Sequence, residues 1–414
     1  MNKSSLTKSH LNNDFCYELF LLFLWGKSIL VGYARALWTH LPEVWGLADF
    51  MVSLVFCTLL FFSLRTFMQR LWARDILFFC FSLLIYVAYY WIFPLNQSYY
   101  KMYAPTFAEK ALPMFLIGAS IIPQKSHRLF QGMYWVSICT ILAFTFYRII
   151  LNPMASGAQA DGDMYAAYLF LPHLCVVMGN AMKKPNPLNI SVAALGSFVL
   201  VSLGTRGTVV CLLAYIVLML MLFQKNKHPV LIASLFVVIA VLLVFGGLLD
   251  WLYDFAESNG LSLRVLDKLK SGNFSQSSGR AVIAERVLEY IFLYPLTGLG
   301  IYSDRRVAGG QYAHNIVLEL MIDFGIIAGL ILFICLVVLI AKATFVARRY
   351  EHNDGAVIIL LAYICSGFLK VFLSGSYLNE DTLFFLIGYC VAILREKKLE
   401  VWTSRNIRAL ERRD

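Results

Sequence analysis

Long apolar runs separated by short polar segments dominate this chain of 414 residues. A helix that crosses a bilayer needs about 20 mostly apolar residues, since each residue advances about 1.5 Å through roughly 30 Å of hydrocarbon. Unpaired backbone groups are too costly in lipid, so the runs are expected to be helical. The candidate runs are residues 15–36, 45–64, 76–95, 107–122, 129–151, 164–182, 188–204, 207–223, 229–248, 313–342, 356–373 and 382–395. The pattern predicts an all-α polytopic membrane protein with about 12 transmembrane helices.

The composition leads to the same class. Hydrophobic residues make up 60% of the chain and charged residues 14%, whereas a soluble domain averages about 45–50% apolar and about a quarter charged residues. A soluble enzyme, a disordered protein and a disulfide-stapled secreted domain are therefore excluded. The net charge of +10 does not indicate nucleic acid, because the basic residues cluster between apolar runs, where they set membrane orientation. The expected environment is a lipid bilayer.

The distribution of Lys and Arg predicts the orientation. The short connections on one side carry most of them, and those on the other side hold only Arg35, Lys101 and Arg206. The positive-inside rule places both termini in the cytoplasm. We expect four parts: residues 1–248 with nine transmembrane helices, 249–312 as a large outer loop carrying part of the active site, 313–395 with the C-terminal transmembrane helices, and 396–414 as a basic cytoplasmic tail.

The long connection, 249–312, is expected to be structured, since loops of that length without a function are uncommon. The pattern of residues 261–270 predicts a short amphipathic helix there. A longer one is predicted over 278–294, begun by Ser277 or Ser278 and stopped by Pro295. Its apolar positions follow helical spacing and are Ile283, Val287, Tyr290, Ile291 and Tyr294.

Three polar sites fall on the outer side of this topology: Arg206 in a glycine-flanked helix hairpin, Arg280 at the start of the loop helix, and His314 where the chain re-enters the membrane. Each has an ordinary explanation, namely a snorkelling arginine, a solvated arginine beside a helix cap, and an interfacial histidine. A helix start disfavours the imidazolium and keeps a histidine neutral. Together, two cations and a neutral base suit a diphosphate ester and the hydroxyl that attacks it.

The residues around these sites resemble a known family. The stretch SSGRAVIAERVLEYIFLYPLTGLGIYSDRRVAGGQYAHNIVLELMIDFGIIAG contains an Arg that opens a loop helix, then P-L-x-G-x-G, then His-Asn followed by Leu-Glu. Upstream, SLGTRGTVV places an arginine at the helix hairpin before the long loop. This order is similar to that of the O-antigen ligase/polymerase family.

The resemblance implies an inverting glycosyltransferase that needs no metal or cofactor and acts at the periplasmic face of the bacterial inner membrane. The donor would be an undecaprenyl diphosphate-linked glycan. Arg206 and Arg280 would hold the diphosphate, with Lys110 as a further basic contact. His314 would activate the acceptor hydroxyl, and Glu380 or Asp381 is a weaker candidate to orient it.

Two acceptors are compatible with the resemblance. A second carrier-linked glycan would make the protein an O-antigen polymerase, which the short Arg280–His314 interval favours, whereas lipid A-core would make it an O-antigen ligase. A chain-length regulator and a flippase are candidate protein partners. The alternative from a different class is a transporter or flippase of polysaccharide intermediates, although no internal repeat of the kind transporters commonly carry is visible. A non-catalytic scaffold would leave the Arg–Arg–His grouping unexplained.

Other residues have ordinary explanations that we favour. Asp161 and Asp163 form a DxD pattern, but a turn in a Gly/Ala-rich loop explains them better than a metal site. His173, beside Pro172, is expected to be a neutral, hydrogen-bonded histidine within a membrane helix, although an ionisable group there is a functional candidate by default. Tyr99, Tyr100 and Tyr103 could stack on sugars, but we assign them to an interfacial belt. Lys370 either adds positive charge near the diphosphate or snorkels.

Overall fold

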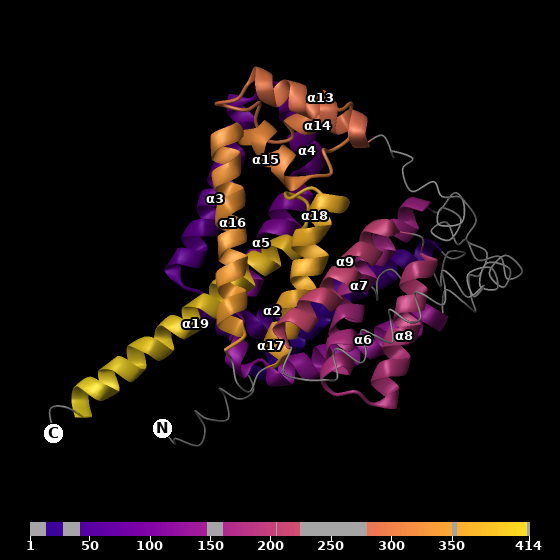
Figure 1. Cartoon of the computed structure of the whole chain (residues 1–414), viewed down its shortest axis with the longest axis vertical. Coiled ribbons are helices and arrows are strands. Elements are labelled where there is room, and N and C mark those ends of the chain that lie inside the picture. The colour runs from indigo at the N-terminus through magenta and orange to yellow at the C-terminus, as the bar shows by residue number, and fades with distance from the viewer. Residues whose placement is uncertain are drawn as a thin grey trace, which may run out of the picture. The chain divides into compact units, whose positions relative to one another are not determined.

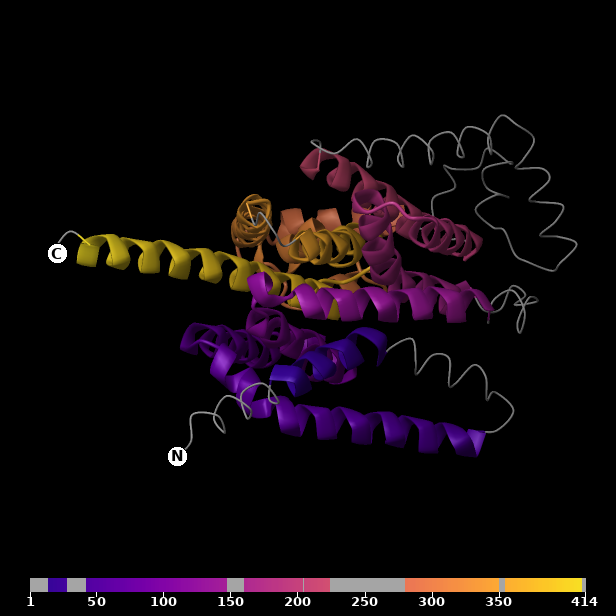
Figure 2. The same cartoon turned by 90° about the horizontal axis from the view of Figure 1, so that it is seen from below.

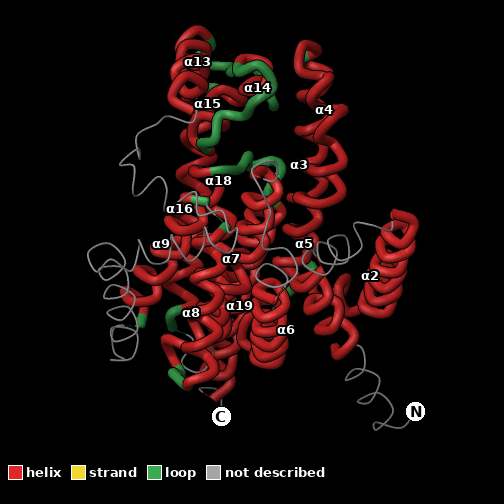
Figure 3. Tube along the Cα trace, turned by 90° about the vertical axis from the view of Figure 1, so that its right-hand side faces the viewer, coloured by secondary structure: helices red, strands yellow, loops and turns green. Residues whose placement is uncertain are grey.

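The computed structural model describes residues 14–27, 42–146, 160–203, 205–223, 280–349 and 354–411. These residues form helices and connecting loops, and no strand occurs among them (Figure 3). The α-helices labelled in Figure 1 are α2 (Pro42–Arg70), α3 (Ala73–Ile92), α4 (Gln97–Ala104), α5 (Leu112–Ser120), α6 (His127–Phe146), α7 (Ala160–Lys183), α8 (Pro187–Ser202), α9 (Arg206–Leu222), α13 (Arg280–Leu293), α14 (Ser303–Val307), α15 (Ile316–Phe324), α16 (Ile326–Ala347), α17 (Asp354–Tyr363), α18 (Lys370–Leu373) and α19 (Asp381–Glu411). Residues 14–27 form a further helix. The all-α expectation is confirmed.

Within the described residues, six helical segments are long and apolar enough to cross a membrane. They are Phe50–Arg70, Ala73–Ile92, His127–Phe146, Tyr165–Lys183, Ile326–Ala347 and Asp354–Leu373. Shorter apolar helices cover Pro187–Val201 and Gly207–Leu222. These segments identify a membrane protein. The expected membrane run at 229–248 and the expected loop helix at 261–270 lie outside the described residues.

The chain forms two compact units, each built from two separate stretches of sequence. The first unit contains Met1–Gln69 and His127–Phe274, and the second contains Arg70–Ser126 and Ser275–Asp414. Helices α6 to α9 therefore belong to the first unit, whereas α3 to α5 and α13 to α19 belong to the second.

Helix α7 forms the core of the first unit, where it packs against α6, α8 and α9. Its residue His173 is buried, and its Nδ1 lies 3.1 Å from the Ser137 Oγ of α6. The same Ser137 oxygen accepts a hydrogen bond from Trp25 Nε1 at 3.0 Å. His173 is thus hydrogen-bonded inside the helix bundle, as predicted. In contrast, Asp161 and Asp163 form the first turn of α7 rather than the loop that we expected.

Helices α5 and α19 meet almost backbone to backbone in the second unit. A Cβ atom at Gly388 of α19 would collide with the carbonyl oxygen of Phe115 in α5, and one at Gly118 of α5 would lie 2.8 Å from the backbone nitrogen of Tyr389. Only glycine leaves room for this approach. Figure 2 shows α19 as one long helix that continues through the basic tail to Glu411.

The expected continuous helix over 313–342 is wrong, because the chain breaks at Gly325 between α15 and α16. Gly325 has φ 85° and ψ 165°, a region that is essentially restricted to glycine. A Cβ atom there would collide with the carbonyl oxygen of Leu296. Hydropathy does not reveal the break, since apolar residues lie on both sides of it.

The P-L-T-G-L-G turn stabilises this break by pairing with its backbone. The Ile326 N–H donates to the Pro295 carbonyl oxygen at 2.7 Å, and the Leu299 N–H donates to the Ile322 carbonyl oxygen at 2.7 Å. Backbone groups that the interrupted helix leaves unpaired are satisfied in this way. Gly298, with φ +64°, packs so tightly here that a Cβ atom would lie 2.6 Å from the Gly325 nitrogen. Gly298 of the motif therefore has a packing role.

Helix α13 corresponds to the predicted loop helix and packs against α14 and α15. Within the described residues it begins at Arg280, whereas Ser277 and Ser278 lie outside them. The residues Ile283, Val287 and Ile291 are buried as predicted, and Tyr290 packs against them. Tyr294, which we placed on the same face, follows the end of α13 and is 47% exposed.

Candidate functional site

His314 lies immediately before α15 in an unusual backbone conformation. Its φ of 55° is positive, which is uncommon for a residue other than glycine and is found often at functional sites. The next residue, Asn315, caps α15 by accepting a hydrogen bond from the Val317 N–H at 2.9 Å. The His-Asn pair of the sequence motif thus consists of a strained histidine followed by a helix cap.

The imidazole of His314 is partly buried and packs against a tyrosine ring. Its ring centroid lies 4.0 Å from that of Tyr312, with 45° between the planes. Its Nδ1 atom is buried and has no hydrogen-bond partner among the described residues. Burial, followed by the positive charges of Arg280 and Arg305, lowers the pKa of His314 from 6.5 to about 4. The ring is therefore neutral near pH 7 and can accept a proton.

Arg280 opens α13 and has an exposed side chain. Its charge acts on both His314 and Tyr312. Two of the three residues singled out as catalytic, Arg280 and His314, are therefore brought into one electrostatic environment. Arg206 begins α9 in the first unit, directly after the N-cap residue Thr205, and its side chain lies outside the described part of the structure.

None of the remaining predicted site residues forms a hydrogen bond or ion pair with His314 within the described residues. Lys110 is exposed in the π-helical segment Pro105–Ala111. Asp381 opens α19 and accepts a hydrogen bond from the Thr382 N–H at 2.7 Å. Glu380 pairs with Lys370, with 2.6 Å between its Oε2 and the lysine Nζ. Lys370 is thus held by an ion pair rather than snorkelling.

The sequence interpretation missed a buried charge cluster, which we define as Asp304, Arg305, Glu319 and Asp323. All four residues are at most 2% exposed. Arg305 Nη1 lies 2.9 Å from Asp304 Oδ1. Burial lowers the pKa of Arg305, but the charges of Asp304, Glu319 and Asp323 outweigh this effect, so the pKa stays above its ordinary value. Charged residues in a polar loop look solvated in a sequence. The available signal was the spacing of Glu319 and Asp323, which places two acids on one face of an otherwise apolar helix.

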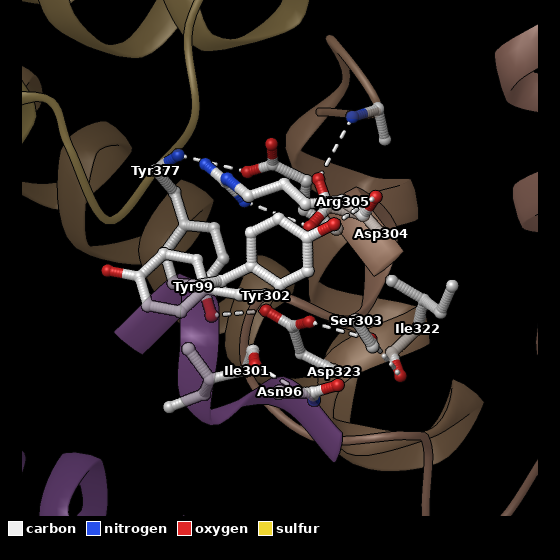
Figure 4. Close-up of polar contacts among 12 residues, drawn as sticks. Asn96, Tyr99, Ile301, Tyr302, Ser303, Asp304, Arg305, Ile322, Asp323 and Tyr377 are labelled. Carbon is white, nitrogen blue, oxygen red and sulfur yellow. Dashed lines mark hydrogen bonds and ion pairs between the residues drawn. The ribbon is translucent and has the colours of Figure 1, made fainter. Parts of the chain in front are cut away.

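The two acidic residues of α15 hold the surrounding loops through hydrogen bonds, and Figure 4 shows Asp323 with its partners Ser303 and Tyr377. Asp323 accepts from Ser303 Oγ at 3.1 Å and from Tyr377 Oη at 2.8 Å. Glu319 accepts from the Tyr377 N–H at 3.0 Å. Burial, then the nearby Asp304 carboxylate, raises the pKa of both Glu319 and Asp323. The cluster therefore links α14, α15 and the segment that contains Tyr377.

Tyrosine rings surround this cluster. The Arg305 guanidinium lies over Tyr302 and Tyr103, 4.7 Å and 4.8 Å from their ring centroids. The Tyr99 hydroxyl donates to the Arg305 carbonyl oxygen at 3.4 Å, and Figure 4 shows Tyr99 and Tyr302 beside the arginine. Tyr100 is 2% exposed. The expected interfacial belt is wrong for Tyr100, which lies in the core of the second unit, whereas Tyr99 and Tyr103 are partly buried against that core.

The fold and site define a helical membrane protein with a neutral histidine beside an exposed arginine charge. The family model for O-antigen ligase matches residues 191–334, a stretch that contains Arg206, Arg280, His314 and the buried charge cluster. This match confirms the resemblance of the chain to the O-antigen ligase/polymerase family. No curated protein matches the chain.

Proposed function

We propose that the protein is a glycosyltransferase that joins an undecaprenyl diphosphate-linked oligosaccharide to an acceptor sugar hydroxyl. The observation that carries the proposal is the partly buried His314, held at positive φ against Tyr312 and under the charge of Arg280, within the residues matched by the O-antigen ligase family. A base with a low pKa stays unprotonated at neutral pH, and a nearby cation offsets the charge of a diphosphate leaving group.

In the proposed reaction, His314 accepts the proton of the acceptor hydroxyl as its oxygen attacks the anomeric carbon of the donor. A glycosidic C–O bond forms, and the C–O bond to the diphosphate breaks with inversion at that carbon. The electron pair of the broken bond leaves with the undecaprenyl diphosphate. Arg280 and Arg206 bind this diphosphate without a metal ion or other cofactor, and Lys110 adds a further positive charge.

The proposed setting is the bacterial inner membrane, with the reaction at the periplasmic face and both termini in the cytoplasm. The supporting argument is the concentration of Lys and Arg in the opposite set of short connections. The sequence interval between Arg280 and His314 favours a polymerase that extends carrier-linked repeat units. The family description, O-antigen ligase, supports transfer to lipid A-core as the second candidate.

The test uses purified protein in lipid nanodiscs with a carrier-linked repeat unit as donor. His314→Ala is expected to lower glycan transfer about 10²- to 10⁴-fold, the usual contribution of a general base, while donor binding is retained. His127→Ala is the matched control, because His127 is exposed in α6 of the first unit. Equal transfer by wild type and His314→Ala would reject the proposal.

Glycan analysis of a deletion strain separates the alternatives. Single repeat units on lipid A-core indicate a missing polymerase, whereas long chains on the carrier with bare core indicate a missing ligase. Carrier-linked units confined to the inner leaflet would instead indicate a transporter or flippase.

A further inference from the structure

Asp304 joins the start of α14 to the residue directly before His314. Its Oδ2 accepts a hydrogen bond from the Ala313 N–H at 3.0 Å, and its Oδ1 pairs with Arg305 Nη1 at 2.9 Å. The loop closed in this way is flanked by Tyr302, with φ 65°, and His314, with φ 55°. Such conformations persist only where surrounding contacts enforce them. The Asp304 side chain provides one of these contacts.

Arg305 acts on the same histidine through the side chain of Tyr312. Its guanidinium lies 5.8 Å from the centroid of Tyr312, and the Tyr312 ring in turn packs against His314 with 4.0 Å between centroids. The Tyr312 hydroxyl donates to the Ser374 carbonyl oxygen at 3.3 Å, which fixes the far side of the ring. The Asp304–Arg305 pair therefore contacts both the backbone before His314 and the ring against its imidazole.

Arg305 is not fully paired, although it is almost completely buried. Its Nε and Nη2 atoms are buried and have no partner within the described residues. Unsatisfied buried donors are rare in native proteins, and each one calls for a reason. Simple anchoring of a loop would not require a buried cation with two unpaired donors. A positive charge held near His314 supplies such a reason.

We propose that Asp304 and Arg305 are positioning residues for His314, which fix its backbone and its ring. This inference rests on the proposed function, since it takes His314 as the base for the acceptor hydroxyl. Neither residue touches the reacting groups in the proposal. Asp304 acts through Ala313, and Arg305 acts through Tyr312 and through its charge.

The charges around the histidine come from several elements. Arg280 of α13 and Arg305 of α14 act on His314 directly, and both lower its pKa. Glu319 of α15, together with Glu380 and Lys370, acts on the neighbouring Tyr312. If the ring is released into solvent, the desolvation that contributes most to the low pKa is relieved. The pKa of His314 then rises toward about 6.5, the ordinary value of histidine.

The first test measures the protonation of His314 without any substrate. Diethyl pyrocarbonate modifies neutral imidazole. Mass spectrometry of the peptide that contains His314 measures the rate of this modification in the full-length protein in nanodiscs. The neutral fraction of a histidine with a pKa near 4 is nearly constant between about pH 7.5 and about pH 5, whereas with a pKa near 6.5 it falls about 30-fold. The modification rate of His314 in the wild type is expected to change little between about pH 7.5 and about pH 5. In Asp304→Asn, this rate is expected to fall at least about 3-fold over the same interval.

The expected shift in Asp304→Asn has a specific cause, and Arg305→Lys and Arg306→Lys extend the test. In Asp304→Asn, the side-chain amide cannot accept both hydrogen bonds, so either Ala313 or Arg305 loses its partner. Arg305→Lys keeps the charge but lacks the planar fork, and it is expected to shift the profile in the same direction. Arg306→Lys is the matched control, because its half-exposed side chain has no ion pair in the described structure, and its profile should match that of wild type.

The second test separates positioning from general damage. Asp304→Asn is expected to lower kcat about 10- to 100-fold, because a small misplacement of a reacting group costs about that much, with little change in the KM for the donor. A wild-type labelling profile in folded Asp304→Asn and Arg305→Lys would overturn the inference, as would unchanged kcat in both. If the labelling profile shifts but wild type transfers no glycan, the proposed function fails and the positioning of His314 stands.

Discussion

Arg395 of α19 and Asp75 of α3 form an ion pair in the second unit, with 2.7 Å between Nη1 and Oδ2. Their side chains are only 9% and 5% exposed. The same Asp75 oxygen accepts a hydrogen bond from the Trp72 N–H at 2.9 Å, and the arginine Nη2 donates to the Ala119 carbonyl oxygen. One arginine thus connects the start of α3 and the end of α5 to α19.

Removing one partner of this pair should destabilise the protein strongly. Arg395→Met leaves the Asp75 carboxylate buried without its cation, which costs about 3–5 kcal/mol in comparable cases. Thermal unfolding of the purified protein measures the loss. The double variant Asp75→Asn with Arg395→Met should lose less than the sum of the single variants, because no unpaired charge remains. Strictly additive losses would contradict this account, and Lys397→Met, with no ion pair in the described structure, is the control.

A second prediction concerns Gly325 at the break between α15 and α16. Gly325→Ala should destabilise the protein by more than Gly310→Ala, although both glycines have positive φ values, +85° and +94°. Backbone strain alone costs about 1–3 kcal/mol at either position. Nothing lies within 4 Å of a Cβ at Gly310, whereas at Gly325 the Leu296 carbonyl oxygen stands in the way. Equal losses of unfolding free energy in the two variants would show that strain, not packing, decides the effect.

The sequence predicted helices well where one physical pattern decides the outcome. Long apolar runs can only be helical in lipid, and each of the six membrane-length segments among the described residues overlaps a predicted run. Burial of Ile283, Val287 and Ile291 follows from their helical spacing alone. The break at Gly325 could not be predicted in this way, because it depends on a distant turn that pairs with the interrupted backbone.

The sequence predicted only part of the site, and the reason is again that packing depends on distant segments. His314 and Arg280 were identified from their sequence context, and the structure places them in one electrostatic environment. Arg305 was missed, since its burial depends on tyrosines from other segments, such as Tyr103 and Tyr302. The amino-acid sequence shows which side chains are aromatic or charged, but it does not show which of them pack together.

The pH dependence of the proposed activity should be displaced toward acid. The base must be neutral to act, so kcat/KM should rise with pH through the pKa of His314, about 4, and remain level above it. Arg280→Gln removes one of the charges that lower this pKa. In this variant, the rise of kcat/KM with pH should therefore move to higher pH. Glycan transfer measured from about pH 4.5 to about pH 8 checks both, and a wild-type midpoint near the ordinary value of about 6.5 would contradict the prediction.

Transfer should also persist in a metal chelator. The proposed diphosphate contacts are arginine and lysine side chains, which offset the charge of the leaving group without a divalent cation. Purified protein is therefore expected to keep its transfer rate in EDTA. A rate that EDTA abolishes and magnesium or manganese restores would contradict the proposal and direct attention to Asp161 and Asp163.

The last prediction separates diphosphate binding from acceptor activation. Arginine can bridge two phosphate oxygens with its planar fork, whereas lysine is a point charge. Arg280→Lys should keep the charge but lose one hydrogen bond, which lowers the transfer rate roughly 10- to 100-fold. Arg280→Ala should lower it further and also weaken donor binding, because no cation remains at that position.

The matched control for Arg280 is Arg286, an exposed arginine of the same helix. Arg286→Lys and Arg286→Ala should leave transfer unchanged, which distinguishes a specific diphosphate contact from the general positive charge of α13. Donor affinity and transfer rate are measured separately on each variant. His314→Ala should change the rate and not the affinity, because the base contacts the acceptor. An unchanged rate in Arg280→Ala, or a loss of donor affinity that explains the whole defect of His314→Ala, would show that the two roles are misassigned.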